Sequence, residues 1–209
     1  MDINEIFYSI QGEGSLSGLP TIFIRTAGCN LRCSYCDSTY AYEKNISMSI
    51  EDILENIEQY HCAEICITGG EPLLQKEIED LIDSLQEKRY HISIETNGSQ
   101  DISKIKEKTN IHISLDVKCP SSEMQSQNNL SNISLLEKTD QLKFIIGTNE
   151  DYEYAKKIIK THQPICMVFF QPVWNTDPAK LARWILKDNL SVHLGLQIHK
   201  ILWGDKKGV

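Results

Sequence analysis

Short apolar runs alternate with longer amphipathic segments along most of this chain, and this alternation is the strongest constraint on its fold. The runs have the length and composition of buried strands, and the segments between them place their apolar residues on one face of a helix. Strands and helices that alternate in this way form a parallel sheet with crossover helices. The expected strands are 4–10, 20–27, 64–68, 91–96, 111–117, 140–146, 165–170 and 192–198, and the expected helices begin after Ser49 or span 77–88, 101–108, 150–161 and 177–188.

The number of strand–helix units predicts how far the sheet closes. About six units follow the first hairpin, which is fewer than the eight of a closed barrel. We therefore predict an α/β fold, an open partial (β/α)6 barrel with a mostly parallel sheet and an N-terminal hairpin extension. A chain of 209 residues is long enough for a sizeable core, and no linker or internal repeat divides it, so we expect a single domain over residues 1–209.

Polar or glycine-rich segments stand where the expected strands end. Because ligands of parallel α/β sheets bind at the carboxyl ends of the strands, these segments are expected to surround one cavity. They are the loop after Gly28 and residues 68–71, 95–98, 116–118 and 171–172.

Two other polar segments have less specific patterns. The turn at 11–14 places two glycines around an acid, which lets the backbone approach a ligand, but its spacing alone favours a plain hairpin connection. The segment 121–131 is rich in Ser, Gln and Asn and is expected to be a mobile loop.

Three cysteines follow the second expected strand as C-x3-C-x2-C: Cys29, Cys33 and Cys36. Three thiolates this close in sequence can converge on one metal centre. A structural zinc site would need a fourth ligand, and the sequence has neither a second C-x2-C pair nor a nearby His-x3-His. Buried thiols without a metal remain an alternative, but a 4Fe–4S cluster with three protein ligands and one open iron explains the motif best.

Composition excludes several other classes of function. A net charge of −8 without a long basic run gives little support to a nucleic-acid surface. The longest apolar runs are far shorter than the ~20 residues that cross a membrane. The N-terminus has no signal-peptide pattern, so we expect a cytoplasmic location. Because the number of cysteines is also odd, we do not expect a disulfide framework. The other cysteines are Cys62, Cys66, Cys119 and Cys166. Cys66 and Cys166 lie in apolar strand-like runs and are interpreted as small buried side chains, and this core interpretation is also favoured over a C-x3-C metal pair of Cys62 and Cys66.

The cysteine motif, with Tyr35 before its last cysteine, resembles that of the radical S-adenosylmethionine (SAM) superfamily. The stretch Thr-Gly-Gly-Glu-Pro at 68–72 is similar to the superfamily's glycine-rich segment, which holds the methionine end of SAM. The resemblance implies that the cysteines bind a 4Fe–4S cluster whose open iron binds the amino and carboxylate groups of SAM. An external electron donor of the flavodoxin or ferredoxin type would supply one electron, which splits SAM into methionine and a 5′-deoxyadenosyl radical.

A finer resemblance is to the 7-carboxy-7-deazaguanine synthase family, and it runs essentially end to end. It rests on Tyr-Ser-Ile-Gln-Gly-Glu-Gly at 8–14, Arg25, Cys-Asp-Ser at 36–38 and Gln-Ile-His-Lys at 197–200. The family acts on 6-carboxy-5,6,7,8-tetrahydropterin. Hydrogen abstraction at the pterin C6 leads to ring contraction and loss of ammonia, with SAM regenerated and Mg²⁺ assisting, and the product feeds queuosine biosynthesis.

The resemblance implies a role for individual residues. Ser38, where the family commonly has Thr, would ligate Mg²⁺ through its hydroxyl. Glu95, Asn97, Ser114 and Asp116 are expected in the SAM site from their positions at strand ends. The implied substrate-binding residues are Ile10, Gln11, Gly12, Glu13, Arg25, Thr68, His199 and the carboxylate of Val209, and the other implied SAM contacts are Tyr35, Cys36, Asp37, Gly70, Gln171, Pro172, Val173 and Trp174.

Several alternatives stay open at this stage. Arg25, expected to bind the substrate carboxylate, could instead form a salt bridge at the strand end. A glycyl-radical activating enzyme shares the cluster motif and the small size, although the turn at 11–14 and Arg25 argue against it. A non-catalytic iron–sulfur or zinc protein is the alternative from another class. We also expect a homodimer, because an open partial barrel leaves sheet edges to cover.

Overall fold

The computed structural model of the chain describes residues 1–43 and 46–209. It contains one open sheet in the order β3-β1-β2-β4-β5-β6-β7-β8-β9. The strands β1 and β2 form an antiparallel hairpin, and β3 pairs antiparallel with the outer edge of β1. On the other side of the hairpin, β2 and the strands β4 to β9 pair in parallel. The strands are β1 (Asp2–Ile10), β2 (Pro20–Thr26), β3 (Ile46–Ser47), β4 (Glu64–Gly69), β5 (His91–Thr96), β6 (Ile111–Val117), β7 (Gln141–Ile146), β8 (Met167–Pro172) and β9 (His193–Leu194).

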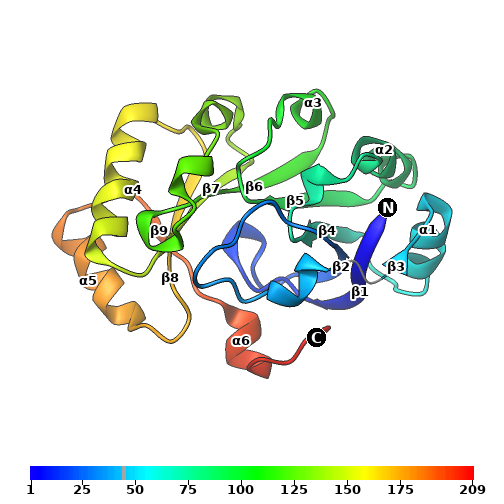
Figure 1. Ribbon diagram of the computed structural model, residues 1–209, viewed down its shortest axis with the longest axis horizontal. Coiled ribbons are helices and arrows are strands. Elements are labelled where there is room, and N and C mark those ends of the chain that lie inside the picture. The colour runs from blue at the N-terminus through cyan, green and yellow to red at the C-terminus, as the bar shows by residue number, and fades with distance from the viewer. Residues whose placement is uncertain (44–45) are drawn as a thin grey trace.

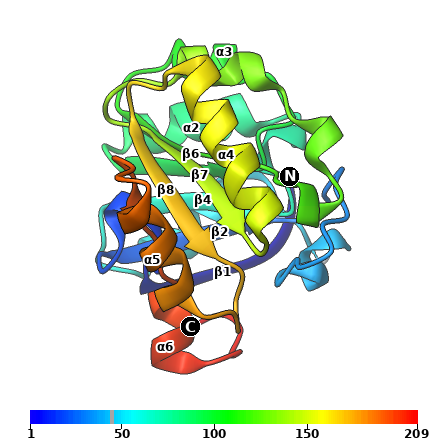
Figure 2. The ribbon, with the colours of Figure 1, turned by 90° about the vertical axis from the view of Figure 1, so that its left-hand side faces the viewer.

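Helices α1 to α5 form an arc around the outside of the sheet, and α6 lies apart near the C-terminus (Figure 1). Figure 2 shows α4 and α5 across β7 and β8, with α6 and the C-terminus at the opposite end of the view from α3. The predicted open partial barrel with an N-terminal hairpin is therefore confirmed. The helices are α1 (Ile50–Glu58), α2 (Ile78–Glu87), α3 (Ser103–Lys106), α4 (Asn149–His162), α5 (Pro178–Lys187) and α6 (Ile198–Trp203).

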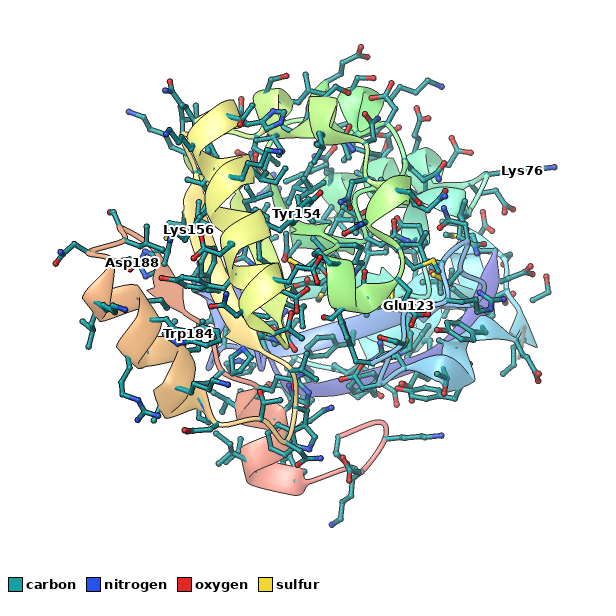
Figure 3. All side chains as sticks on the ribbon, turned by 60° about the vertical axis from the view of Figure 1, so that its left-hand side comes forward. Lys76, Glu123, Tyr154, Lys156, Trp184 and Asp188 are labelled. Carbon is teal, nitrogen blue, oxygen red and sulfur yellow. The ribbon has the colours of Figure 1, made fainter. Side chains whose placement is uncertain are left out.

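Local sequence signals begin several helices as expected. Ser49 caps α1 in a capping box with Asp52, which confirms the start predicted there. Thr148 and Asp151 form the same box at α4. Lys156 of α4 lies beside Asp188 after α5 (Figure 3), and the Nζ to Oδ2 distance of 2.6 Å ties these two helices together.

The two faces of the sheet have different roles because successive side chains of a strand point to opposite sides. Ile22 and Ile24 of β2 are fully buried in one apolar cluster with residues of β4, α1 and α2. Phe23 and Arg25, which alternate with them, line a cavity on the other face. The apolar face therefore holds the helices in place, and the opposite face is free to carry polar groups.

One expectation about a single segment is wrong, and the structure adds detail to a second. The last strand, predicted at 192–198, contains only His193–Leu194, and Ile198 already begins α6. The chain leaves the sheet there because the Ile198 amide donates to the Gly12 carbonyl instead of a strand, at 2.9 Å. The segment 121–131, expected as a loop, contributes to three short 3-10 turns, and Ser122 and Asn132 in this region are fully buried.

Within residues 1–43 and 46–209, no helix is both long and apolar enough to span a bilayer.

Candidate active site

A cavity of about 770 Å³ lies at the carboxyl ends of the parallel strands. The cysteine loop, the glycine-rich segment after β4 and the ends of β5, β6 and β8 all contribute to it, as the polar strand ends predicted. Every residue proposed from sequence for the cluster, SAM, the substrate or Mg²⁺ lines this cavity except Ser114. Ser114 faces the same side two residues before Asp116, but it is buried below the cavity and accepts a hydrogen bond from Gln141 at 2.8 Å.

The cysteine loop carries three free thiols on the cavity wall. Gly28, with a φ of +88°, turns the chain out of β2, and Leu31 anchors the loop in the core with 1% exposure. The Ser34 amide donates to the Ser122 carbonyl at 3.2 Å, so the first 3-10 turn after β6 supports the loop from the other side. The segment 121–131, which contains Ser122, is therefore in direct contact with the cysteine loop.

The donor set at this loop consists of thiols, and cysteine thiolates are the ligands that hold iron–sulfur clusters. Among the residues that the structure describes, no three His, Cys, Asp or Glu side chains are grouped so that they could hold one metal ion. The Cys29 thiol also accepts from the Leu31 amide at 3.4 Å and from Asn97 Nδ2 at 3.7 Å, and hydrogen bonds of this kind tune cluster thiolates.

The glycine-rich segment after β4 packs directly against the cysteine loop. A Cβ on Gly70 would lie 2.1 Å from the Gly28 carbonyl oxygen, so only glycine permits this approach. The Glu71 amide donates to the same carbonyl at 2.9 Å. Gly70 therefore lines the cavity and also allows the close packing that positions the loop that carries Cys29.

Glu71, which sequence reasoning did not single out, is fully buried behind this segment. Its carboxylate accepts from the Asn97 amide at 2.6 Å, from the Thr96 hydroxyl at 2.8 Å and from the Leu73 amide at 3.0 Å. Burial raises the pKa of Glu71 to about 7, although these hydrogen bonds act in the opposite direction. Glu71 thus joins the ends of β4 and β5 and orients Asn97, which faces Cys29.

Two lysines neutralise the acids of the cavity: Lys118, in the segment 116–118 expected there from sequence, and Lys143, which the sequence did not single out. Lys143 of β7 lies among Glu13, Glu95 and Asp116, and Lys118 pairs with Asp116 at 2.8 Å. Burial raises the pKa of Glu95, whereas the two lysines outweigh burial at Asp116 and hold its pKa below the ordinary value. A lysine within an apolar strand pattern gives no signal of such partners, since the partners come from distant strands.

The turn at 11–14 is both a hairpin connection and part of the cavity wall. It contacts α6 so closely that a Cβ on Gly12 would lie 2.0 Å from His199 Nδ1. Gln197 Nε2 donates to Glu13 Oε1 at 2.8 Å, which ties the start of α6 to the same turn. This contact brings His199 to the cavity from a helix rather than from the expected last strand.

Asp37 and Ser38 follow the last cysteine and face the same helix. Asp37 pairs with Lys200 at 2.8 Å and accepts from the Ser38 hydroxyl at 3.0 Å. Burial raises the pKa of Asp37, but Lys200 and these hydrogen bonds outweigh it and lower the pKa to about 2. The Ser38 hydroxyl on the cavity wall is a hard oxygen of the kind that Mg²⁺ takes as one of several ligands.

Arg25 combines both interpretations of its role. Its Nε donates to Glu5 Oε1 at 2.8 Å, which is the strand-end salt bridge considered as an alternative. Its guanidinium also lies against the rings of Phe7 and Tyr40 and lines the cavity. Tyr35, next to the last cysteine, has a buried hydroxyl without a hydrogen-bond partner among the described residues, which leaves it available to a bound group.

Comparison with known proteins identifies the family. Residues 23–163 match the Radical SAM superfamily model. The 7-carboxy-7-deazaguanine synthase of Methanospirillum hungatei is 43% identical, over 97% of this chain and 85% of that protein. The protein of the same name from Chlorobaculum tepidum is 37% identical, over 100% and 97% of the two chains. The chain belongs to the 7-carboxy-7-deazaguanine synthase family.

Solved structures agree with this assignment. QueE from Escherichia coli matches with a TM-score of 0.71 and 25% identity, over 93% of this chain and 92% of that one. Streptococcus suis SuiB bound to S-adenosylmethionine matches with a TM-score of 0.55 over 80% and 44% of the chains, and at 16% identity it supports the fold alone. The chain is therefore a radical SAM enzyme whose cofactors are a 4Fe–4S cluster and SAM. Family membership sets aside the activating-enzyme and non-catalytic alternatives.

Proposed function

We propose that this chain converts 6-carboxy-5,6,7,8-tetrahydropterin to 7-carboxy-7-deazaguanine with loss of ammonia, as a step of queuosine and deazapurine biosynthesis. The observation that carries the proposal is a single cavity that joins three free cysteine thiols to the turn at 11–14 and to a set of paired acids and bases. One substrate can thus lie beside the cofactors and against polar groups at the same time. The whole chain, residues 1–209, would act as one domain.

Cys29, Cys33 and Cys36 would hold the cluster on one side of this cavity. When bound, the cluster and SAM supply a 5′-deoxyadenosyl radical that removes a hydrogen from the substrate. Tyr35, Gly70 and Asn97 would position SAM from the cysteine side. Asp37, Glu95, Asp116 and the segment 171–174 would surround the rest of SAM and keep water from the reacting atoms.

The opposite wall would bind the pterin. Ile10, Gln11 and Gly12 offer backbone and amide groups that match its donor and acceptor edge, with Glu13 as an ionised acceptor. The terminal nitrogens of Arg25 have no hydrogen bond among the described residues, because only Nε contacts Glu5. Arg25, His199 and the C-terminal Val209 are therefore available to the polar groups of the substrate, with Thr68 beneath them.

We also propose a Mg²⁺ ion at Ser38, an external flavodoxin- or ferredoxin-type electron donor, a homodimer and a cytoplasmic location. For Mg²⁺ the support is the Ser38 hydroxyl on the cavity wall. The open sheet edges at β3 and β9 support the dimer. The donor and the location stay predictions from the sequence.

Anaerobic turnover tests the proposed function. The purified chain is reconstituted to about four iron and four sulfide per chain and incubated with the carboxy-tetrahydropterin, SAM and a reductant, with and without Mg²⁺. We expect the deazapurine chromophore to form at less than stoichiometric SAM, faster with Mg²⁺. Release of 5′-deoxyadenosine without any deazapurine from this pterin would show that the substrate is wrong.

A further inference from the structure

Lys143 lies at the centre of a group of carboxylates that line the cavity. Lys143 is only 5% exposed to solvent. Its ammonium lies 2.8 Å from Glu13, 3.1 Å from Glu95 and 3.3 Å from Asp116. These three acids come from the loop after β1, from β5 and from β6, so one side chain of β7 connects three separate parts of the site.

Lys143 donates hydrogen bonds to two of the three carboxylates around it, those of Glu13 and Glu95. An ammonium group carries three protons, and three carboxylates from different elements surround it. Asp116 Oδ1 lies at ion-pair distance, 3.3 Å, and makes no hydrogen bond among the described residues. Two of the three donors are therefore directed at Glu13 and Glu95, so Lys143 fixes the positions of these two acids.

Without Lys143, the group of carboxylates would carry several like charges in a buried place. Glu13, Glu95 and Asp116 would share Lys118, which pairs with Asp116 alone. Buried carboxylates that face one another take up protons, and a protonated carboxyl group is a poorer acceptor. Lys143 holds the pKa of Glu13 below its ordinary value and offsets part of the burial that raises the pKa of Glu95, and it holds both carboxylates against one point.

We infer that Lys143 is a positioning residue for substrate recognition, which holds Glu13 and Glu95 as a pair of carboxylate acceptors for a ligand edge with adjacent N–H donors. The amino-pyrimidinone edge of a pterin carries such donors, so the inference rests on the proposed function. Glu13 shares its other oxygen with Gln197 of α6, which joins the acceptor pair to the helix over the site. Charge-assisted hydrogen bonds to both acids would select a pterin over a ring that lacks these donors.

The test compares Lys143→Met with Lys143→Arg in the reconstituted enzyme. Methionine keeps the volume of the side chain and removes its charge, so we expect the KM for the pterin to rise about tenfold or more, with iron content retained. Arginine keeps the charge and is expected to recover part of the loss. Lys106→Met is the matched control, because Lys106 pairs with Glu137 and Asp140 in a partly buried cluster outside the cavity, and its KM should match wild type.

A pH series separates positioning from a general loss of structure. In Lys143→Met, the pterin KM should fall as the pH rises from about 6 to about 8, because the acids must ionise without their lysine. Other titratable or charged groups face these carboxylates from β2, β4, the cysteine loop and α6, namely Arg25, Cys66, Asp37 and His199, in addition to Lys118. They are present in both proteins, so the difference between variant and wild type isolates Lys143.

The outcomes decide between the two claims. If wild type forms no deazapurine, the proposed function fails and this inference falls with it. If wild type is active and Lys143→Met keeps its KM and pH profile, or Lys106→Met changes as much, only the inference fails. If Lys143→Met does not fold, Glu95→Gln replaces it: a rise in pterin KM of about tenfold supports the acceptor pair, and an unchanged KM overturns it.

Discussion

Gly70 shows how a single residue determines the position of the cysteine loop. Its missing side chain lets β4 approach Gly28 and Cys29 within contact distance. In Gly70→Ala the new Cβ would overlap backbone atoms, which cannot rotate away, so the loop must move. We expect a loss of about 3 kcal/mol of stability and a lower iron content per chain after reconstitution. Wild-type iron content and melting temperature in Gly70→Ala would contradict this account of the loop.

Glu71 gives a pH dependence whose sign can be worked out. Its pKa is raised to about 7 in the folded chain, so the folded state holds this proton more tightly than the unfolded state. The stabilisation is fully present below the unfolded pKa and is lost as the pH rises through about 7. The loss attributable to Glu71 is about 3 kcal/mol, measurable as a fall in the free energy of unfolding by denaturant titration.

Glu71→Gln tests that assignment directly. Glutamine does not ionise, so the fall in stability between about pH 4 and about pH 7 should become shallower than in wild type. The side-chain NH2 of the glutamine would also face the N–H of Asn97 or Leu73, so one of these hydrogen bonds would be lost. We expect this loss to lower the free energy of unfolding by about 2 kcal/mol at low pH. The exposed Glu123 (Figure 3) supplies a control, because Glu123→Gln should leave the slope as in wild type. An equal slope in Glu71→Gln and wild type would contradict the prediction.

At the scale of elements, the contact between α6 and the turn at 11–14 completes the proposed pterin wall. Gly12→Ala would put a methyl group 2.0 Å from His199 Nδ1 and force α6 away. We expect the pterin KM to rise about tenfold with a smaller change in the KM for SAM. Gly18→Ala, in the same loop with no atom within 4 Å of the new Cβ, is expected to cost about 1 kcal/mol of stability from its positive φ without changing the KM. Equal KM values in both variants would show that α6 does not serve the substrate.

The sequence predicted the elements well where the signal is local. His91–Thr96 and Ile111–Val117 were predicted to the residue, because each is an apolar run bounded by turn residues. The final element was not, since residues 192–198 have a strand pattern but the Gly12 carbonyl and Gln197 contacts begin a helix there. That choice depends on a turn more than 180 positions earlier, as the Glu13–Gln197 separation of 184 residues shows.

The site followed the same rule. The cysteines and strand-end residues were predictable because their motifs are contiguous in the chain. Lys143 and Glu71 were not, because their roles depend on strand register, which pairs Asp116 with Lys143 across β6 and β7. Ser114 was placed in the SAM site by its strand position, but it is buried and does not line the cavity. Pairing between distant strands cannot be read from one sequence.

At the scale of the whole molecule, the open sheet predicts self-association. Both edge strands, β3 and β9, expose an apolar residue, Ile46 at 54% and Leu194 at 38%. Unprotected edges of this kind are usually covered. We expect light scattering after size exclusion to give about twice the 23.9 kDa of one chain, and a mass of one chain at micromolar concentration would contradict the dimer.

The most direct measurement of the whole account is turnover by single cysteine variants under anaerobic conditions. With pterin, SAM and reductant, Cys29→Ala, Cys33→Ala and Cys36→Ala are each predicted to give neither 5′-deoxyadenosine nor deazapurine. Cys62→Ser, at a cysteine outside the cavity lining, is predicted to turn over like wild type. Deazapurine formation by any of the three alanine variants at the wild-type rate would contradict the claim that these thiols hold the catalytic cluster.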